Sequence, residues 1–321
     1  MIGRRGKVLL LLYGMFLVLL FLMCSTDLII REPEKEIYQI AVIIEDVRSD
    51  QYSNFRKGMD QAAVEFNADV HFITLYEKAD AIQQMELMER EQQDDADALI
   101  VVPADEERVP AKQMGIPVIL LRPRRMVEAE EGSVIIEYER MGEQLALEML
   151  EDASPNCSVL ILTGQGRQSA MDNLFLEGAN KVFIDNGYNV QTIVKDQSNG
   201  FRDDLENIVN WDNKKALILA VDPESLTEAA GILADNPDIE KKVQGLYGRG
   251  STLPILNYLD RGQIAGVCVT DEFSVGYLCV RTAIRELEGD RYQPPIVMTS
   301  YYIEKKDLRD PAYEKLLFPI E

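Results

Sequence analysis

Short apolar runs alternate with amphipathic stretches along the whole chain after residue 37. Most runs are continuous, as in residues 40–44, a pattern typical of strands that are buried on both faces of a parallel sheet. Between the runs, apolar residues recur at helical spacing, so that Tyr52, Phe55 and Met59 fall on one face of a predicted helix. This regular order predicts right-handed crossovers and therefore an α/β fold with doubly wound parallel sheets.

The number of predicted strands indicates two lobes, because about nine buried strands over roughly 280 residues exceed one hydrophobic core. The series of strand–helix units breaks near Glu137 and Tyr138, and the pattern changes again after Asp271. A further extended run covers residues 295–302. The predicted strands are residues 40–44, 70–75, 98–102, 118–121, 159–162, 190–194, 216–219, 243–246 and 264–269.

The N-terminus predicts attachment to a membrane. Arg4, Arg5 and Lys7 precede an apolar run from residue 8 to residue 24. As a helix this run would be about 25 Å long, close to the ~30 Å hydrocarbon core of a bilayer. Basic residues stay on the cytoplasmic side, so the rest of the chain is expected on the extracytoplasmic side.

Two interpretations of residues 1–26 stay open. An uncleaved anchor is favoured, because the run exceeds the roughly 7–15 apolar residues of a signal peptide and no small-x-small cleavage site follows. The alternative is a lipoprotein signal with Cys24 lipidated, although Met23 is larger than the residue expected before such a cysteine. Residues 27–37 contain Pro33, are charged from Arg31 onward and are predicted to form a tether.

Composition excludes several classes of function. The net charge is −22, and an acidic surface repels phosphate backbones, so no nucleic-acid partner is expected. His71 is the only histidine and lies inside a predicted strand, which counts against a histidine-based metal site or a Ser-His-Asp triad. The spacing of the four cysteines suggests neither a disulfide framework nor a zinc site. We therefore expect no enzyme activity, no metal and no cofactor.

Several segments carry a family resemblance through their order and spacing. They are the run 40–44 with Phe55-Arg-Lys-Gly58-Met, the segments 97–103 and 115–121, and Val243-Gln-Gly245 followed by Gly262-Gln-Ile-Ala-Gly-Val. Together they resemble the type I periplasmic binding proteins, specifically the ribose/galactose-type solute-binding branch. The resemblance implies two lobes joined by three hinge crossings, with a ligand in the cleft between them. It assigns residues 38–137 plus 271–294 to the N-terminal lobe and residues 138–270 plus 295–321 to the C-terminal lobe.

The candidate ligand-binding residues lie at or near the carboxyl ends of the predicted strands, where α/β proteins bind ligands. They are Ser49, Tyr52, Arg122, Asn173, Asp222, Tyr247 and Thr270.

Several of these candidates depart from the pattern of the family. Asn173 stands where the family has an arginine, Asp222 where it has an asparagine, and Thr270 where it has a glutamine at the second hinge. Tyr247 lies in a Gly-Leu-Tyr-Gly turn in place of Gly-Phe-Asp-Gly, and Tyr52 is what remains of an aromatic pair. The resemblance therefore implies the fold, while the usual pentose or hexose site is not evidently intact.

Three candidates have a second interpretation. Arg122 could bind a carboxylate or phosphate of the ligand with its guanidinium, or it could join Arg124 and Arg125 in a solvated loop that pairs with the acids of residues 128–131. Tyr52 could stack on a sugar or fill the core. Asp222 could accept ligand hydroxyls or cap the helix that begins at Pro223.

The leading hypothesis is a membrane-attached, extracytoplasmic solute receptor that closes two lobes on a small polar ligand. The expected ligand is a sugar or sugar derivative, and an anionic one stays open because of Arg122. The membrane partner is either an ABC importer permease or a sensor kinase, and an uncleaved anchor favours the kinase. The alternative is a protein-interaction module that keeps the fold but has lost the small-molecule site.

Overall fold

The computed structural model describes residues 4–25, 37–105, 108–109, 114–123, 132–154, 157–210, 215–290 and 293–319. The chain divides into two units, Met1–Ile37 and Tyr38–Glu321. The first unit contains helix α1 (Arg4–Ser25), in which Arg4–Leu22 has a mean hydropathy of 2.0 and is long and apolar enough to cross a membrane. A signal sequence satisfies the same criterion. The side chain of Cys24 and nearly all of the predicted tether lie outside the described residues.

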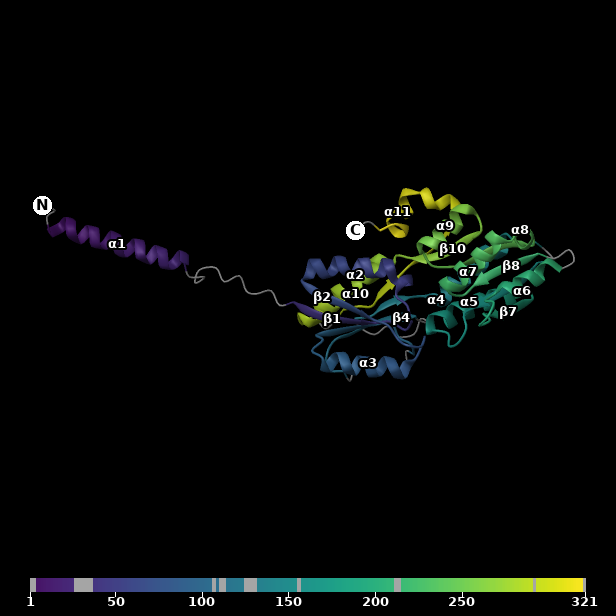
Figure 1. Cartoon of the computed structure of the whole chain (residues 1–321), viewed down its shortest axis with the longest axis horizontal. Helices are drawn as coiled ribbons and strands as arrows, with labels where there is room; N and C mark the ends of the chain where they lie inside the picture. The colour runs from purple at the N-terminus through teal and green to yellow at the C-terminus, as the bar shows by residue number, and fades with distance from the viewer. Residues whose placement is uncertain are drawn as a thin grey trace. The chain divides into compact units, whose positions relative to one another are not determined.

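The second unit contains two six-stranded sheets with the same internal strand order (Figure 1). The first sheet has the order β11-β5-β4-β3-β1-β2 and is parallel throughout. It comprises β1 (Tyr38–Ile43), β2 (Ala68–Ile73), β3 (Ala98–Val101), β4 (Val118–Pro123), β5 (Val134–Ile136) and β11 (Ile296–Met298). These sheets confirm the predicted fold class.

The second sheet has the order β12-β10-β9-β8-β6-β7, in which β12 runs antiparallel to β10 and the other described pairs are parallel. It comprises β6 (Ser158–Thr163), β7 (Val190–Val194), β8 (Ala216–Ala220), β9 (Val243–Arg249), β10 (Gly266–Thr270) and β12 (Ser300–Glu304).

Helices cover the two faces of each sheet. The helices next to the first sheet are α2 (Ser53–Phe66), α3 (Ala81–Gln93) and α10 (Glu272–Leu287), with the short 3-10 helix η1 (Asp50–Tyr52) before α2. The rest of the second unit contains α4 (Tyr138–Glu151), α5 (Ala170–Asp185), α6 (Arg202–Asn207), η4 (Ile208–Asn210), α7 (Pro223–Asp235), α8 (Pro237–Glu240), α9 (Leu253–Arg261), η5 (Lys305–Arg309) and α11 (Pro311–Leu317).

Alternate residues of β1 face two different helix layers, as the continuous apolar run predicts. Ile40 and Val42 are fully buried in the core that contains Phe55 of α2. Ala41 is fully buried in a separate core that contains Met88 of α3. Figure 1 shows α2 and α10 on one side of the first sheet and α3 on the other.

Two helices leave the sheet that precedes them and cover the other one. Helix α4 follows β5 but contacts β9, β10 and β12, and α10 follows β10 but contacts β3, β4 and β5. Each packs closely against a partner helix at a glycine: a Cβ on Gly142 of α4 would lie 2.0 Å from the carbonyl oxygen of Phe175, and one on Gly276 of α10 would lie 2.0 Å from that of Phe55. The chain therefore passes between the sheets before α4 and before α10.

A third passage separates β11 from β12. Residues 295–302 were predicted as one extended run in the C-terminal lobe, but Ile296 pairs with Val134 in the first sheet, whereas Ser300 pairs with Thr270 in the second. We propose that the N-terminal lobe comprises residues 38–137 and 271–298, and the C-terminal lobe residues 138–270 and 300–321. The short strand β5 was not predicted, because three residues are too few to show a pattern.

Candidate ligand-binding site

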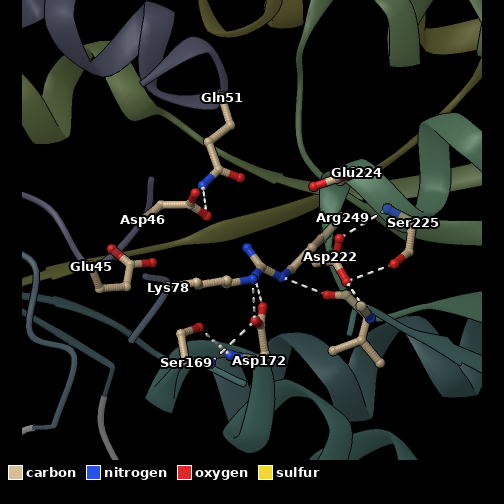
Figure 2. Close-up of polar contacts among 12 residues, drawn as sticks. Glu45, Asp46, Gln51, Lys78, Ser169, Asp172, Asp222, Glu224, Ser225 and Arg249 are labelled. Atoms are coloured by element: carbon tan, nitrogen blue, oxygen red, sulfur yellow. Dashed lines mark hydrogen bonds and ion pairs between the residues drawn. The ribbon is translucent and has the colours of Figure 1, made fainter. Parts of the chain in front are cut away.

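A cleft lies where the carboxyl ends of the two sheets face each other, and polar side chains from both lobes line it (Figure 2). Glu45 follows β1 and Lys78 follows β2. From the second lobe come Asp172 at the start of α5 and Arg249 at the end of β9. The space in the cleft that a water-sized sphere can enter measures about 60 Å³, which is room for several water molecules at roughly 10–15 Å³ each.

An ion-pair cluster centred on Asp172 joins the lobes. Lys78 Nζ lies 3.0 Å from Asp172 Oδ2, and the Arg249 guanidinium pairs with the other oxygen, Oδ1. Arg249 Nε also donates to the Val221 carbonyl at 2.9 Å, and its guanidinium lies 5.1 Å from the ring centroid of Tyr138. Lys78 belongs to the first lobe and the other two ionic groups to the second, so the carboxylate of Asp172 bridges the cleft.

The start of helix α5 fixes the position of Asp172. Ser169 is the N-cap residue: the backbone N–H of Asp172 donates to its Oγ at 3.2 Å, and its own backbone N–H donates to Asp172 Oδ2 at 3.3 Å. This capping box holds the carboxylate at a helix N-terminus. Burial alone would raise the pKa of Asp172, but Arg249 and Lys78 lower it below its usual value, so the carboxylate is ionised at neutral pH.

Two further carboxyl groups line the cleft without an ion-pair partner among the described residues. Glu45 is only 2% exposed, and burial raises its pKa to about 7, although the Tyr52 hydroxyl donates to it at 2.7 Å. Glu272, the first residue of α10, also has its pKa raised to about 7 by burial, partly offset by Arg249. Both groups therefore change protonation near neutral pH.

Asp222 lines the cleft and caps a helix at the same time. It is the N-cap residue of α7 and accepts from the Ser225 backbone N–H at 2.9 Å and from the Ser225 hydroxyl at 2.7 Å. The backbone N–H of Gly164 donates to it at 3.2 Å. The structure therefore shows Asp222 as a helix cap. A ligand hydroxyl could still donate to the lone pairs of the carboxylate that Ser225 and Gly164 leave free.

A second inter-lobe ion pair lies at one mouth of the cleft. Arg48 of the first lobe and Glu224 of α7 approach to 2.5 Å, and Lys195 also pairs with Glu224 at 3.0 Å. Both partners of the inter-lobe pair are more than half exposed, so this contact stabilises little. They line an open hollow of about 500 Å³ that continues outward from the cleft.

The structure brings two of the seven predicted residues to the cleft, Tyr52 and Asp222. Tyr247 is 1% exposed and donates to Asp152 Oδ2 at 2.8 Å, away from the lining residues described. Thr270 is 6% exposed at the end of β10, and its hydroxyl has no hydrogen-bond partner among the described residues. Neither of these two side chains lines the described part of the cleft.

Of the remaining three candidates, two lie elsewhere and the side chain of the third lies outside the described residues. Ser49 precedes η1 as its N-cap residue. Asn173 is exposed and lines a separate inter-lobe hollow of about 770 Å³. Arg122 belongs to β4, where it pairs in register with Ile135, but its side chain lies outside the described residues, as do Arg124 and Arg125.

Sequence reasoning missed the main charged residues of the cleft: Glu45, Lys78, Asp172, Arg249 and Glu272. A signal existed for Asp172, because Ser169 followed three residues later by an acidic residue at a strand–helix junction is a capping-box pattern. Glu45 also follows directly on a predicted strand. Lys78 lies in a loop, and the sequence carries no pattern that singles it out.

The sequence profile described as a periplasmic binding protein domain matches residues 40–291, and the chain therefore belongs to this family. This confirms the resemblance on which the two-lobed expectation rested. The family consists of solute-binding proteins rather than enzymes, and its domain implies a location outside the cytoplasm. No curated protein matches the sequence.

Solved structures of sugar-binding solute receptors have the same fold. An ABC transporter solute-binding protein from Agrobacterium vitis, bound with alpha-D-tagatopyranose, has a TM-score of 0.73 and 17% identity over 88% of this chain and 100% of that one. A carbohydrate transporter solute-binding protein from Agrobacterium radiobacter, in complex with D-arabinose, has a TM-score of 0.72 and 16% identity over 88% and 99%. A glucose-galactose binding protein from Geobacillus stearothermophilus has a TM-score of 0.70 and 18% identity over 86% and 100%. At these identities the likeness shows the fold alone.

Proposed function

We propose that this chain is an extracytoplasmic receptor, without enzymatic activity, that closes its two lobes on a small sugar or sugar derivative. The observation that carries the proposal is the cleft in which Glu45 and Lys78 of one lobe meet Asp172 and Arg249 of the other. A sugar hydroxyl both donates and accepts hydrogen bonds. Each wall of the cleft therefore presents a carboxyl group that can accept and a cation that can donate, and this arrangement is complementary to such a ligand.

Aromatic rings beside these charged groups support the same ligand class. Tyr52 and Phe55 line the cleft and pack edge to face with ring centroids 5.9 Å apart, and Tyr138 lies on the same lining. Their rings offer apolar surface to the C–H face of a sugar ring. We therefore propose that Tyr52 and Asp222, predicted from the sequence, contact the ligand together with the other carboxyl groups of the cleft.

Binding is expected to act through a shift between open and closed lobes. A ligand favours the closed state only by the free energy of contacts that exist in that state alone. Groups from both lobes surround the cleft, so one ligand can contact both at once. The three chain passages between the sheets would serve as the hinge.

We further propose that the chain stays attached to a membrane through α1 and passes its closed state to a membrane protein. The partner is an ABC permease or a sensor kinase, and an uncleaved anchor supports the kinase because a tethered receptor remains beside it. Co-purification from membranes tests this part: recovery of a permease without a kinase would contradict the sensing role.

The ligand is tested by thermal unfolding of the full chain in detergent with pentoses, hexoses, sugar acids and sugar phosphates. A compound at about 100 times its dissociation constant should stabilise the fold by roughly 2.7 kcal/mol. Asp172→Asn should lose this shift, whereas Asp185→Asn, an exposed position on the same helix, should keep it. No shift with any compound would contradict the proposal and favour the protein-interaction module.

A further inference from the structure

Lys78 places a positive charge at the centre of the cleft. Its ammonium group crosses from the first lobe to Asp172 of the second, 3.0 Å away, and its side chain is 28% exposed. Burial would lower the pKa of Lys78, yet the nearby carboxylates of Asp172 and Asp222 raise it above its usual value. The electrostatic field at this position therefore favours a cation.

Arg249, the other cation of the described lining, is fixed to the wall of the second lobe. It binds Asp172 and the Val221 carbonyl. Its guanidinium also lies 5.1 Å from the ring of Tyr138 and 5.8 Å from that of Phe175. A ligand could accept hydrogen bonds from the remaining N–H groups of this guanidinium, but it could displace the guanidinium only by breaking a buried ion pair. Lys78 has one strong contact and a flexible four-carbon stem, so it is the group that can move aside.

Carboxyl groups outnumber cations in the described part of the cleft. Four lining residues carry carboxyl groups and two carry positive charges. If Lys78 turns outward, Arg249 is the remaining described cation on the lining. Glu45 and Glu272 have no ion-pair partner among the described residues, although Arg249 lowers the pKa of Glu272. A positive group near either carboxyl group would favour its ionised form.

The Lys78–Asp172 ion pair lies across the cleft. Both residues line it and they come from opposite lobes, so a ligand group that binds Asp172 at this position must displace the Lys78 ammonium. Tyr52, Phe55 and Tyr138 line the same cleft, and an aromatic face attracts a cation that lies within about 6 Å of the ring centroid. A ligand ammonium in this cleft would therefore lie among carboxyl groups and aromatic rings.

From these contacts we infer that the ligand carries a protonated amine, which replaces the Lys78 ammonium on Asp172. The ligand class is a small polyhydroxylated amine, with hexosamines as its simplest members. This inference rests on the proposed sugar-receptor function and specifies which sugars the receptor accepts.

The experiment is calorimetric titration of the full chain in detergent near neutral pH with three sets of probes and one anionic sugar. The sets are D-glucosamine, D-galactosamine and D-mannosamine; their neutral parent hexoses; and their N-acetyl derivatives, which lack the charge. The anionic sugar is D-glucuronate. A hexosamine should bind at least about ten-fold tighter than its parent hexose and its N-acetyl derivative, since each 1.4 kcal/mol of lost ion pairing is ten-fold in affinity.

Substitution of Lys78 shows whether this residue competes with the ligand or contacts it, because the two roles change hexosamine affinity in opposite directions. If its ammonium competes with the ligand, Lys78→Met tightens hexosamine binding several-fold, whereas Lys78→Arg keeps the competitor and does not. Lys181→Met, an exposed lysine on α5 that pairs with Glu143, is the matched control and should leave affinity unchanged. Asp172→Asn should abolish binding, and each variant's unfolding temperature is measured to show that it is folded.

Each outcome has one meaning. A neutral hexose that binds as tightly as the hexosamine overturns the amine inference and leaves the sugar receptor in place. Binding of D-glucuronate in preference to any hexosamine overturns it too and favours Arg122 as an anion site. Weaker hexosamine binding by Lys78→Met also overturns it, because Lys78 would then be a ligand contact. Absence of binding by every probe, D-glucuronate included, overturns both the inference and the sugar-receptor function.

Discussion

The Glu45→Gln substitution tests whether the buried Glu45 carboxyl group destabilises the folded protein when it ionises. The Glu45 carboxyl is 2% exposed, and burial raises its pKa from 4.5 to about 7. Between these two values the folded protein binds a proton at this site that the unfolded chain does not bind. A group with a raised pKa contributes stability below its unfolded value and loses that contribution as the pH rises through its folded value.

The size of the effect follows from the two pKa values. From pH 5 to pH 8 the contribution of Glu45 to the free energy of unfolding should fall by about 2.5 kcal/mol, at about 1.4 kcal/mol per pKa unit. The amide of the Glu45→Gln variant cannot ionise, so the variant should gain about this amount relative to the wild type over the same range. Urea unfolding at the two pH values measures the difference.

A matched glutamate separates this effect from a general charge effect. Glu86 is exposed on α3, and Glu86→Gln should change stability by the same small amount at both pH values. Glu272 should leave a residual pH dependence in the Glu45→Gln variant, because burial raises its pKa as well. An identical stability difference between Glu45→Gln and wild type at pH 5 and pH 8 would refute the reasoning.

Three other substitutions test single contacts by urea unfolding. Asp222→Ala removes the N-cap of α7 and should cost about 1–2 kcal/mol; an unchanged midpoint would contradict the capping role. Gly142→Ala places a Cβ 2.0 Å from the carbonyl oxygen of Phe175, so α4 and α5 must separate, at about 1–3 kcal/mol; wild-type stability would show that the helices are not so close. Tyr247→Phe loses the hydrogen bond to Asp152 and should cost about 1 kcal/mol while leaving any ligand-induced shift intact, because Tyr247 does not line the described cleft.

Much of the fold was predictable because a strand that is buried on both faces of a sheet has a continuous run of apolar residues. The runs at residues 40–44 and 216–219 contain fully buried apolar residues of central strands, and such strands tolerate few polar residues. The edge of the first sheet was less predictable. Strands β5 and β11 have three residues each, which is too short for any periodicity to show.

The site was harder to predict because a shift of one or two residues moves a side chain out of the cleft. Asn173 was proposed where Asp172 lines the cleft, and one residue along a helix turns a side chain by about 100°. Tyr247 was proposed as a strand end, but β9 continues to Arg249, whose side chain reaches the cleft. The Lys78 ammonium group reaches the cleft because its long side chain extends from a loop, and no local sequence pattern predicts such a contact.

The exchange of α4 and α10 between the sheets bears on how the protein unfolds. Each sheet is covered on one face by a helix from the other half of the chain. Loss of either half would therefore strip a layer from the sheet that remains and expose its apolar face to water. The two lobes are separate bodies for ligand capture but are expected to form a single cooperative unit on heating.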